Sequence, residues 1–115
     1  MCIRDRSRGM HSTIYGRLRD PGLTSDDCRI LLDNYYRNFK NIIVLPVDTF
    51  PSTKWVKNTN QIFLSVKVDI RNGRIIILSA IDNLLKGQTG QAIQNLNIMS
   101  GVSIEDGLDL TNNFP

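Results

Sequence analysis

The sequence predicts an α+β fold in which strands and helices pack around one antiparallel hairpin. Three patterns support this. Within residues 61–82, apolar residues recur at every second position from Ile62 to Ile70, and an apolar run follows after Asn72-Gly73, as in two paired strands. Apolar residues recur at helical spacing between Thr24 and Phe39, and again between Ala92 and Met99. At 115 residues, the chain is one domain or a piece of one.

Composition points to a globular protein and excludes several function classes. Hydrophobic residues make up 41% and charged residues 22%, and no apolar run is long enough to span a bilayer. We therefore expect a cytoplasmic protein without a membrane partner. The net charge of +3 comes with only 7% aromatic residues, so we expect no nucleic-acid partner. Cys2, Cys28 and a single histidine lack metal-ligand spacing, so no metal site is expected. Two thiols in a cytosolic chain are most simply free, so no disulfide is expected.

The N-terminal part predicts a loose start followed by a strand. Residues 1–7 lack periodicity, and we expect them to be disordered or non-native sequence. From Met10 to Tyr15 the residues alternate in a strand pattern, and the single histidine, His11, lies within this expected strand. Arg8 is a candidate binding residue, because its guanidinium forms a rigid fork suited to phosphate or carboxylate.

A helix is expected after the Asp20-Pro21-Gly22 turn. Thr24 is the predicted N-cap, and two aspartates follow in the first turn, where negative charge suits the helix dipole. One continuous apolar face is expected, made of Cys28, Leu31, Leu32, Tyr35 and Phe39. Cys28 is interpreted as a small buried hydrophobe rather than a nucleophile.

Two further strand regions follow. A short strand within Asn41–Val47 should end at Pro46 on a sheet edge. In the hairpin, Asn72-Gly73 predicts a two-residue type I′ turn, which places Arg71 opposite Arg74. The expected pairs that follow are Ile70 with Ile75, Val68 with Ile77 and Val66 with Ser79. The hairpin is expected to form the core, and its second face, with Ile76 and Leu78, is expected to need a partner surface.

The segment from Ala80 to Gly101 is the most informative stretch. A strand leads into a polar elbow at Asp82–Lys86, two glycines follow at Gly87 and Gly90, and a helix begins. Its apolar stripe comprises Ala92, Ile93, Leu96 and Met99. Such a connection offers backbone donors and a positive dipole end to a polar ligand, although it also fits a purely structural elbow.

The elbow resembles a family signature. The pattern D-N-L-x-K-G-x-x-G-Q-A-x-Q-N-x-N-x-M-x-G, from Asp82 to Gly101, is similar to the C-terminal signature of the N-acetyl-gamma-glutamyl-phosphate reductases. The segment from Arg8 to Leu18, with Thr13 and Tyr15 at the matching positions, resembles that family's R-G-I-x-x-T-x-Y strand. Residues 51–60 resemble its P-x-T-K-x-V-x-G-S-N segment, with Asn58-Thr59 in place of Gly-Ser. The family's histidine and proline before Arg8 are missing.

The resemblance implies a fold like the C-terminal domain of glyceraldehyde-phosphate dehydrogenase: a mostly antiparallel sheet with helices on one face. It implies an NADP-dependent oxidoreductase of arginine biosynthesis that reduces a small acyl phosphate to a semialdehyde through a thiolate, as a homo-oligomer (dimer or tetramer). Cofactor contacts are expected at Asn83, Lys86, Gly87 and Gly90, and a substrate contact at Arg8. No catalytic residue is expected in this stretch, so the chain alone should be inactive.

The implied organisation has four parts. Residues 1–7 precede a partial substrate and dimerisation domain at 8–82, an elbow and helix at 83–110 pack on an NADP-binding domain encoded elsewhere, and 111–115 form a tail. Three alternatives stay open: a related lysine-pathway reductase, an aspartate-semialdehyde dehydrogenase, and a non-catalytic dimerisation module. Asp82 and Asn83 could also simply cap the helix start.

Overall fold

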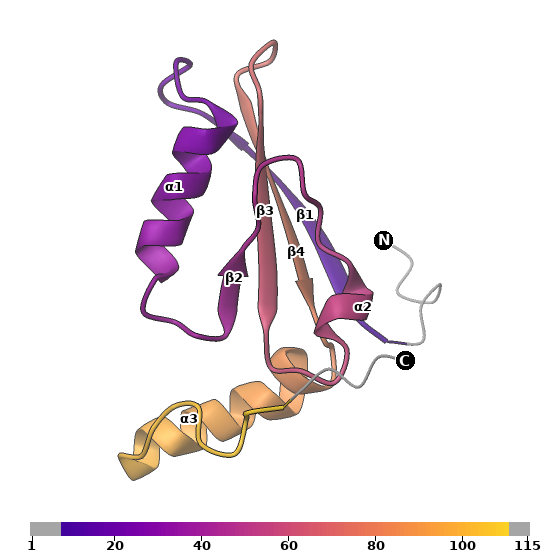
Figure 1. Cartoon of the computed structure of the whole chain (residues 1–115), viewed down its shortest axis with the longest axis vertical. Helices are drawn as coiled ribbons and strands as arrows, with labels where there is room; N and C mark the ends of the chain where they lie inside the picture. Colours follow the sequence, from indigo (N-terminus) through magenta and orange to yellow (C-terminus); the bar gives the residue numbers. More distant parts are fainter. Residues whose placement is uncertain (1–7, 111–115) are drawn as a thin grey trace.

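The computed structural model describes residues 8–110, which form one four-stranded sheet with helices around it (Figure 1). The expected loose start at 1–7 and tail at 111–115 lie outside the described residues. The strands are β1 (Met10–Arg17), β2 (Ile42–Val44), β3 (Ile62–Asp69) and β4 (Arg74–Ile81). The helices are α1 (Ser25–Tyr36), the single turn α2 (Thr53–Val56), the π-helical turn η2 (Leu85–Thr89) and α3 (Gly90–Ser100).

The sheet has the strand order β1-β4-β3-β2. β4 pairs antiparallel with both β1 and β3, whereas the short edge strand β2 runs parallel to β3. The expected α+β class with a mostly antiparallel sheet is confirmed, and so is the edge position of the strand that ends before Pro46. Within residues 8–110, no helix is long and apolar enough to cross a membrane.

The predicted register of the β3–β4 hairpin is wrong by two residues. Asp69 pairs with Arg74, which leaves a four-residue loop in place of the expected two-residue turn. A type I′ turn needs positive φ at both central residues, and here only Gly73 adopts it, at +59°. The Asp69 carboxylate accepts hydrogen bonds from the Arg71 N–H and the Asn72 side chain, which favours the wider loop.

A small apolar core lies between α1 and the hairpin. Cys28, Val66 and Val68 are buried together, with Leu32 and Ile75 among the residues packed around them. Thr24 caps α1 in a full capping box with Asp27, as its sequence position predicts. The expected continuous apolar face is split, however, because Leu31 and Tyr35 are 60% and 75% exposed. α1 packs on β3 and the short β2.

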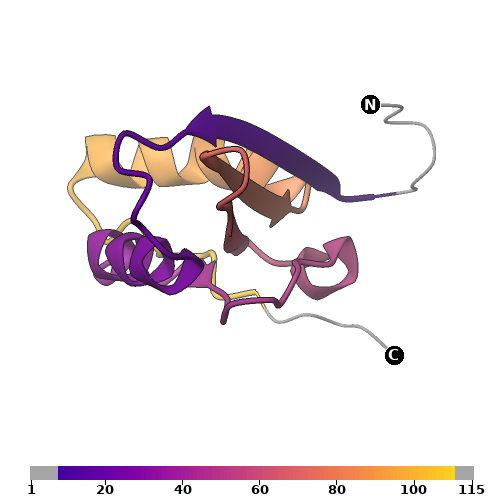
Figure 2. The same ribbon diagram turned by 90° about the horizontal axis from the view of Figure 1, so that it is seen from above.

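The helices lie on both faces of the sheet and at one of its ends. Seen from above, α1 and α2 lie on opposite sides of the strands (Figure 2). α2 contributes Trp55, whose ring meets the ring of Phe63 edge-on at 5.9 Å between centroids. α3 crosses the end of the sheet at which β4 finishes (Figure 1). The elbow from β4 into α3 is therefore the joint between the sheet and the last helix.

Candidate functional site

The elbow is built on one buried carboxylate. Asp82 has no exposed surface and accepts three hydrogen bonds. Its Oδ2 accepts from the Arg8 guanidinium and from the Asn58 backbone N–H, both at 2.7 Å, and its Oδ1 accepts from the Leu84 N–H at 2.9 Å. Three segments that are distant in sequence therefore meet at this side chain. The Leu84 contact is an Asx-type turn, so Asp82 does cap the start of the elbow.

Arg8, the expected substrate residue, is turned toward its own chain. Its Nη2 forms the ion pair with Asp82, and its Nη1 donates to Asn58 Oδ1 at 2.5 Å. The remaining guanidinium nitrogen, Nε, is buried and has no hydrogen-bond partner among the described residues. A substrate contact through either terminal nitrogen would have to compete with these internal bonds.

Asn58 stands where the resembling family has glycine, and it keeps a glycine-like backbone. Its φ is +63°, in the left-handed region that asparagine tolerates better than most residues. This conformation accompanies the hydrogen bond from its N–H to Asp82 and the acceptor role of its side chain toward Arg8. The replacement of Gly by Asn therefore does not abolish the special backbone shape at this position.

Asn83, the first expected cofactor residue, is half-buried beside the start of β1. Its Oδ1 accepts a hydrogen bond from the Gly9 backbone N–H at 2.8 Å. Gly9 has φ +97°, and a Cβ there would lie 2.5 Å from Thr53 Cβ, so only glycine fits this crossing. The Asn83 amide oxygen is thus used within the chain, and its NH₂ group is the part that remains to offer a ligand.

The two elbow glycines lie in different surroundings. Gly87 is exposed within η2, and its N–H donates to the Asp82 carbonyl at 2.9 Å. Gly90 is buried, and a Cβ there would lie 2.1 Å from Asn60 Oδ1 and 2.9 Å from the Leu85 carbonyl. Close approach is therefore needed at Gly90 for the chain's own packing, whereas at the exposed Gly87 a Cβ would lie 3.3 Å from the Asp82 carbonyl oxygen, a much milder overlap. The sequence does not predict the π-helical turn η2, which contains Gly87 and ends directly before Gly90.

Lys86 points inward to α3. Its Nζ donates to Gln94 Oε1, and Gln94 is only 2% exposed. Burial lowers the pKa of the Lys86 ammonium, and the nearby Glu105 carboxylate acts in the opposite direction. Lys86 therefore supports the contact between the elbow and the last helix.

α3 presents its polar side to the rest of the chain and its apolar side to the surface. The expected stripe is present, but Leu96 and Met99 are 60% and 84% exposed. The buried positions are instead polar: Gln94 meets Lys86, and the Asn97 amide donates to two backbone carbonyls of the following segment, at Ile104 and Asp106. Sequence reasoning missed these two residues, because amides on a helix are ordinarily solvated.

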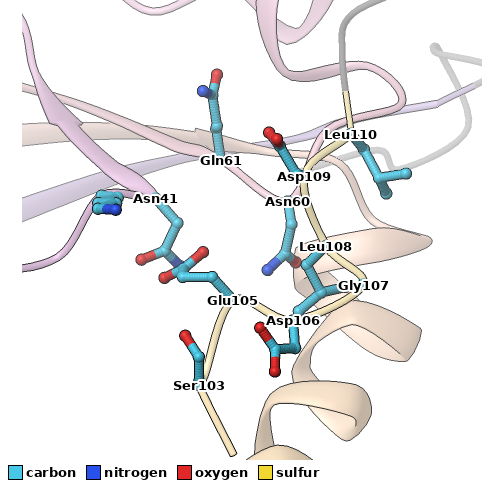
Figure 3. Close-up of a pocket in the computed structure, with 11 residues that line it drawn as sticks. Asn41, Asn60, Gln61, Ser103, Glu105, Asp106, Gly107, Leu108, Asp109 and Leu110 are labelled. Atoms are coloured by element: carbon cyan, nitrogen blue, oxygen red, sulfur yellow. The ribbon is translucent and has the colours of Figure 1, made fainter.

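A polar cavity of about 490 Å³ lies between that C-terminal segment and the starts of β2 and β3. Figure 3 shows Asn41, Asn60, Glu105 and Asp106 around it. Asn60 is 3% exposed, and neither of its amide atoms has a hydrogen-bond partner among residues 8–110. Amide donors and carboxylates are mixed here, so the lining does not select one class of ligand. No cluster of three or more metal-ligating side chains occurs in the described part of the chain.

Within residues 8–110, the histidine and the cysteine lie away from the elbow. His11 is a half-buried strand residue of β1, paired with Ala80. Cys28 is 5% exposed in the apolar core, where burial raises the pKa of its thiol and the Asp27 carboxylate raises it further. A buried thiol that resists ionisation is a poor nucleophile, in agreement with the prediction that Cys28 is a core residue.

Comparisons with known proteins converge on one class. A family model described as semialdehyde dehydrogenase, dimerisation domain, matches residues 3–83. Proteins named N-acetyl-gamma-glutamyl-phosphate reductase from Prochlorococcus marinus strains AS9601 and MIT 9312 are 94% and 93% identical over 109 residues. A protein of the same name from strain NATL2A is 58% identical over 108 residues. The first two alignments each cover 95% of this chain but 31% of the relative, and the third covers 94% and 30%. The chain thus spans about 31% of the length of these relatives.

Proposed function

The chain belongs to the semialdehyde dehydrogenase family, dimerisation domain, and from that premise we propose that it is the C-terminal part of an NADP-dependent N-acetyl-gamma-glutamyl-phosphate reductase. The names of relatives that are up to 94% identical support this assignment over the lysine-pathway and aspartate-semialdehyde alternatives. The complete protein would reduce N-acetyl-glutamyl phosphate to the semialdehyde in arginine biosynthesis, as a cytoplasmic enzyme.

The role of this chain within such an enzyme is inferred from one structural observation: α3 buries polar side chains and exposes its apolar ones. Its buried amides contact Lys86 of the elbow and the backbone of the segment after the helix, and Ile93, Leu96 and Met99 are 38%, 60% and 84% exposed on the other side. An exposed apolar stripe of this kind marks a surface that is covered by another part of a protein. We assign it to the NADP-binding domain, which the remaining length of the relatives would supply.

The elbow next to that stripe offers a small part of a cofactor site. Asn83 and Gly87 fit a contact with the nicotinamide end, because the Asn83 NH₂ group can donate to an amide oxygen and Gly87 lies open at the surface. Lys86 and Gly90 fit such a contact less well, since both face the chain's own interior. When bound, NADPH would supply the hydride, and Asn83 and Gly87 would hold its nicotinamide end in place.

The sheet face opposite α1 is our candidate for the contact between subunits. Tyr15 on β1 is 67% exposed and lies opposite Ile76 on β4, next to the pair of Thr13 and Leu78. Aromatic and aliphatic side chains at neighbouring positions of a sheet form a surface that a second copy can cover. The description of the matched family as a dimerisation domain supports a homo-oligomer.

The reactive thiol of the reductase would lie outside this chain. Cys28 is buried and its pKa is raised, so it does not provide the nucleophile that acyl-phosphate reduction needs. The chain alone should therefore show no NADPH oxidation with the acyl phosphate, while the complete protein should.

The test uses two Asn83 substitutions in the complete protein. Asn83→Ala removes the whole amide, whereas Asn83→Asp keeps an oxygen that can accept the Gly9 N–H, removes the NH₂ donor and adds a negative charge. A cofactor contact predicts that both raise the KM for NADPH, with exposed Asn95→Ala as an unaffected control. Normal kinetics for Asn83→Asp would return Asn83 to a structural role. Absence of reductase activity in the complete wild-type protein would favour the non-catalytic module.

A further inference from the structure

We propose that Asp82 is a positioning residue for cofactor binding, acting through Arg8 and Asn58 to fix the elbow that carries Asn83. This inference rests on the proposed cofactor role of Asn83. It replaces the expected substrate contact of Arg8 with an internal one. The geometry that supports it is a closed triangle of three residues from separate segments, Arg8, Asn58 and Asp82, with Asp82 directly before Asn83 in sequence.

The triangle is closed because each member contacts the other two. The Arg8 guanidinium donates through Nη2 to Asp82 and through Nη1 to Asn58, and the Asn58 N–H donates to the same Asp82 oxygen. Asp82 is 0% exposed and the Arg8 side chain is 27% exposed, so water competes little for these bonds. A charge-assisted, forked contact of this kind fixes orientation as well as distance.

A second tie runs beside the first. Gly9 follows Arg8 in sequence, and its N–H donates to Asn83 Oδ1, while Asn83 follows Asp82. Residues 8–9 and 82–83 are therefore joined by two adjacent contacts, directly beyond the last β1–β4 ladder pair of Met10 and Ile81. Any displacement of Arg8 that follows loss of the Asp82 charge would move the Gly9 N–H as well, and would free the Asn83 side chain.

Stability alone explains the arrangement poorly. A buried ion pair repays its desolvation cost only with good geometry and full hydrogen bonding, and here Arg8 Nε is buried with no partner in the described residues. What the triangle achieves is a single conformation for Asn83. Positioning of a ligand-contacting residue by buried hydrogen bonds is a general means of preorganising a site.

The experiment is a double-mutant cycle in the complete reductase. Asp82→Asn keeps the side-chain shape and removes the charge, and Arg8→Lys keeps the charge and removes the fork. Each should raise the KM for NADPH on the order of tenfold, the worth of about one charge-assisted hydrogen bond, with a smaller change in kcat. Because Asp82 acts through Asn83, Asp82→Asn should add little when introduced into Asn83→Ala. Arg29→Gln, which breaks the exposed pair with Asp26, is the control.

A second readout does not depend on activity. Loss of the triangle should speed hydrogen exchange at the Gly9 N–H in Asp82→Asn and Arg8→Lys, while core amides of β3 keep their protection. Equal KM effects of Asp82→Asn with and without Asn83→Ala, or unchanged Gly9 exchange, would overturn the inference. If Asn83→Ala leaves the kinetics normal but Gly9 exchange still quickens in Asp82→Asn and Arg8→Lys, the proposed cofactor role of the elbow is wrong. Positioning of Asn83 then stands as a structural fact alone.

Discussion

The exposed apolar face of α3 leads to a quantitative prediction: substitutions on it should destabilise the complete protein more than the chain alone. Substituting Leu96→Ser and Met99→Ser together should cost the chain alone little, because these side chains are 60% and 84% exposed there. Full burial of a Leu or Met side chain contributes about 1.5–3 kcal/mol, so the share already buried is worth about 1–2 kcal/mol for the pair. If the NADP-binding domain covers the face, the complete protein should lose about 2–4 kcal/mol more.

Urea denaturation of the chain and of the complete protein, each with and without the double substitution, measures this difference. Leu108→Ser is the matched control, because Leu108 is 5% exposed and its loss should destabilise both forms. Equal losses for the double variant in the two forms would refute the reasoning, since the face would then be either free in both or packed in both. A large loss in the chain alone would show that α3 turns its apolar side inward in solution.

Three further predictions concern the chain itself. Asp27→Asn should lower stability at neutral pH. Hydrogen bonds from Thr24 lower the pKa of Asp27, so its contribution is present above the ordinary value of 3.8 and is lost as pH falls through the lower folded value. Urea midpoints of wild type and variant that stay apart at the lowest pH would contradict this. In a Cys2→Ser background, Cys28 should react with iodoacetamide only after unfolding, and rapid native alkylation would show that the core opens. Gly90→Ala should cost about 1–3 kcal/mol through overlap with Asn60 and the Leu85 carbonyl, and an unchanged urea midpoint would mean that the turn relaxes freely.

The hairpin shows which part of a sheet a sequence determines by itself. Alternation assigns side chains to faces, and a slip of two residues leaves that assignment intact because the side-chain period of a strand is two. This is why Val66 and Val68 are core residues as expected although every predicted partner is wrong. The register depends on the turn, and there the Asp69 carboxylate stabilises a longer loop than the Asn72-Gly73 pair suggests.

The helices show the opposite case. Periodicity identifies the apolar stripe of α3 correctly, but it does not reveal what that stripe packs against. Gln94 and Asn97 are buried because Lys86 and two backbone carbonyls meet them, and those partners become neighbours only after the chain has folded. The same limit applies to the Asp82 triangle, whose members are separated by up to 74 positions. The elbow motif was visible in the sequence, whereas the carboxylate that holds it was interpreted only as a cap.

The strand order has a consequence for how this chain reaches its structure. β1 precedes the other three strands of this sheet in chain order, yet its partner is β4, so the pair of Met10 and Ile81 cannot form until β4 has been made. Pairings between remote segments close late, because chain entropy is spent before any contact is gained. We expect the β3–β4 hairpin to assemble first and to serve as the template on which β1 docks. The Arg8–Asp82 contact, which lies beyond that last pair, would then be among the final events of folding, and a nascent chain would carry an unpaired β4 edge until then.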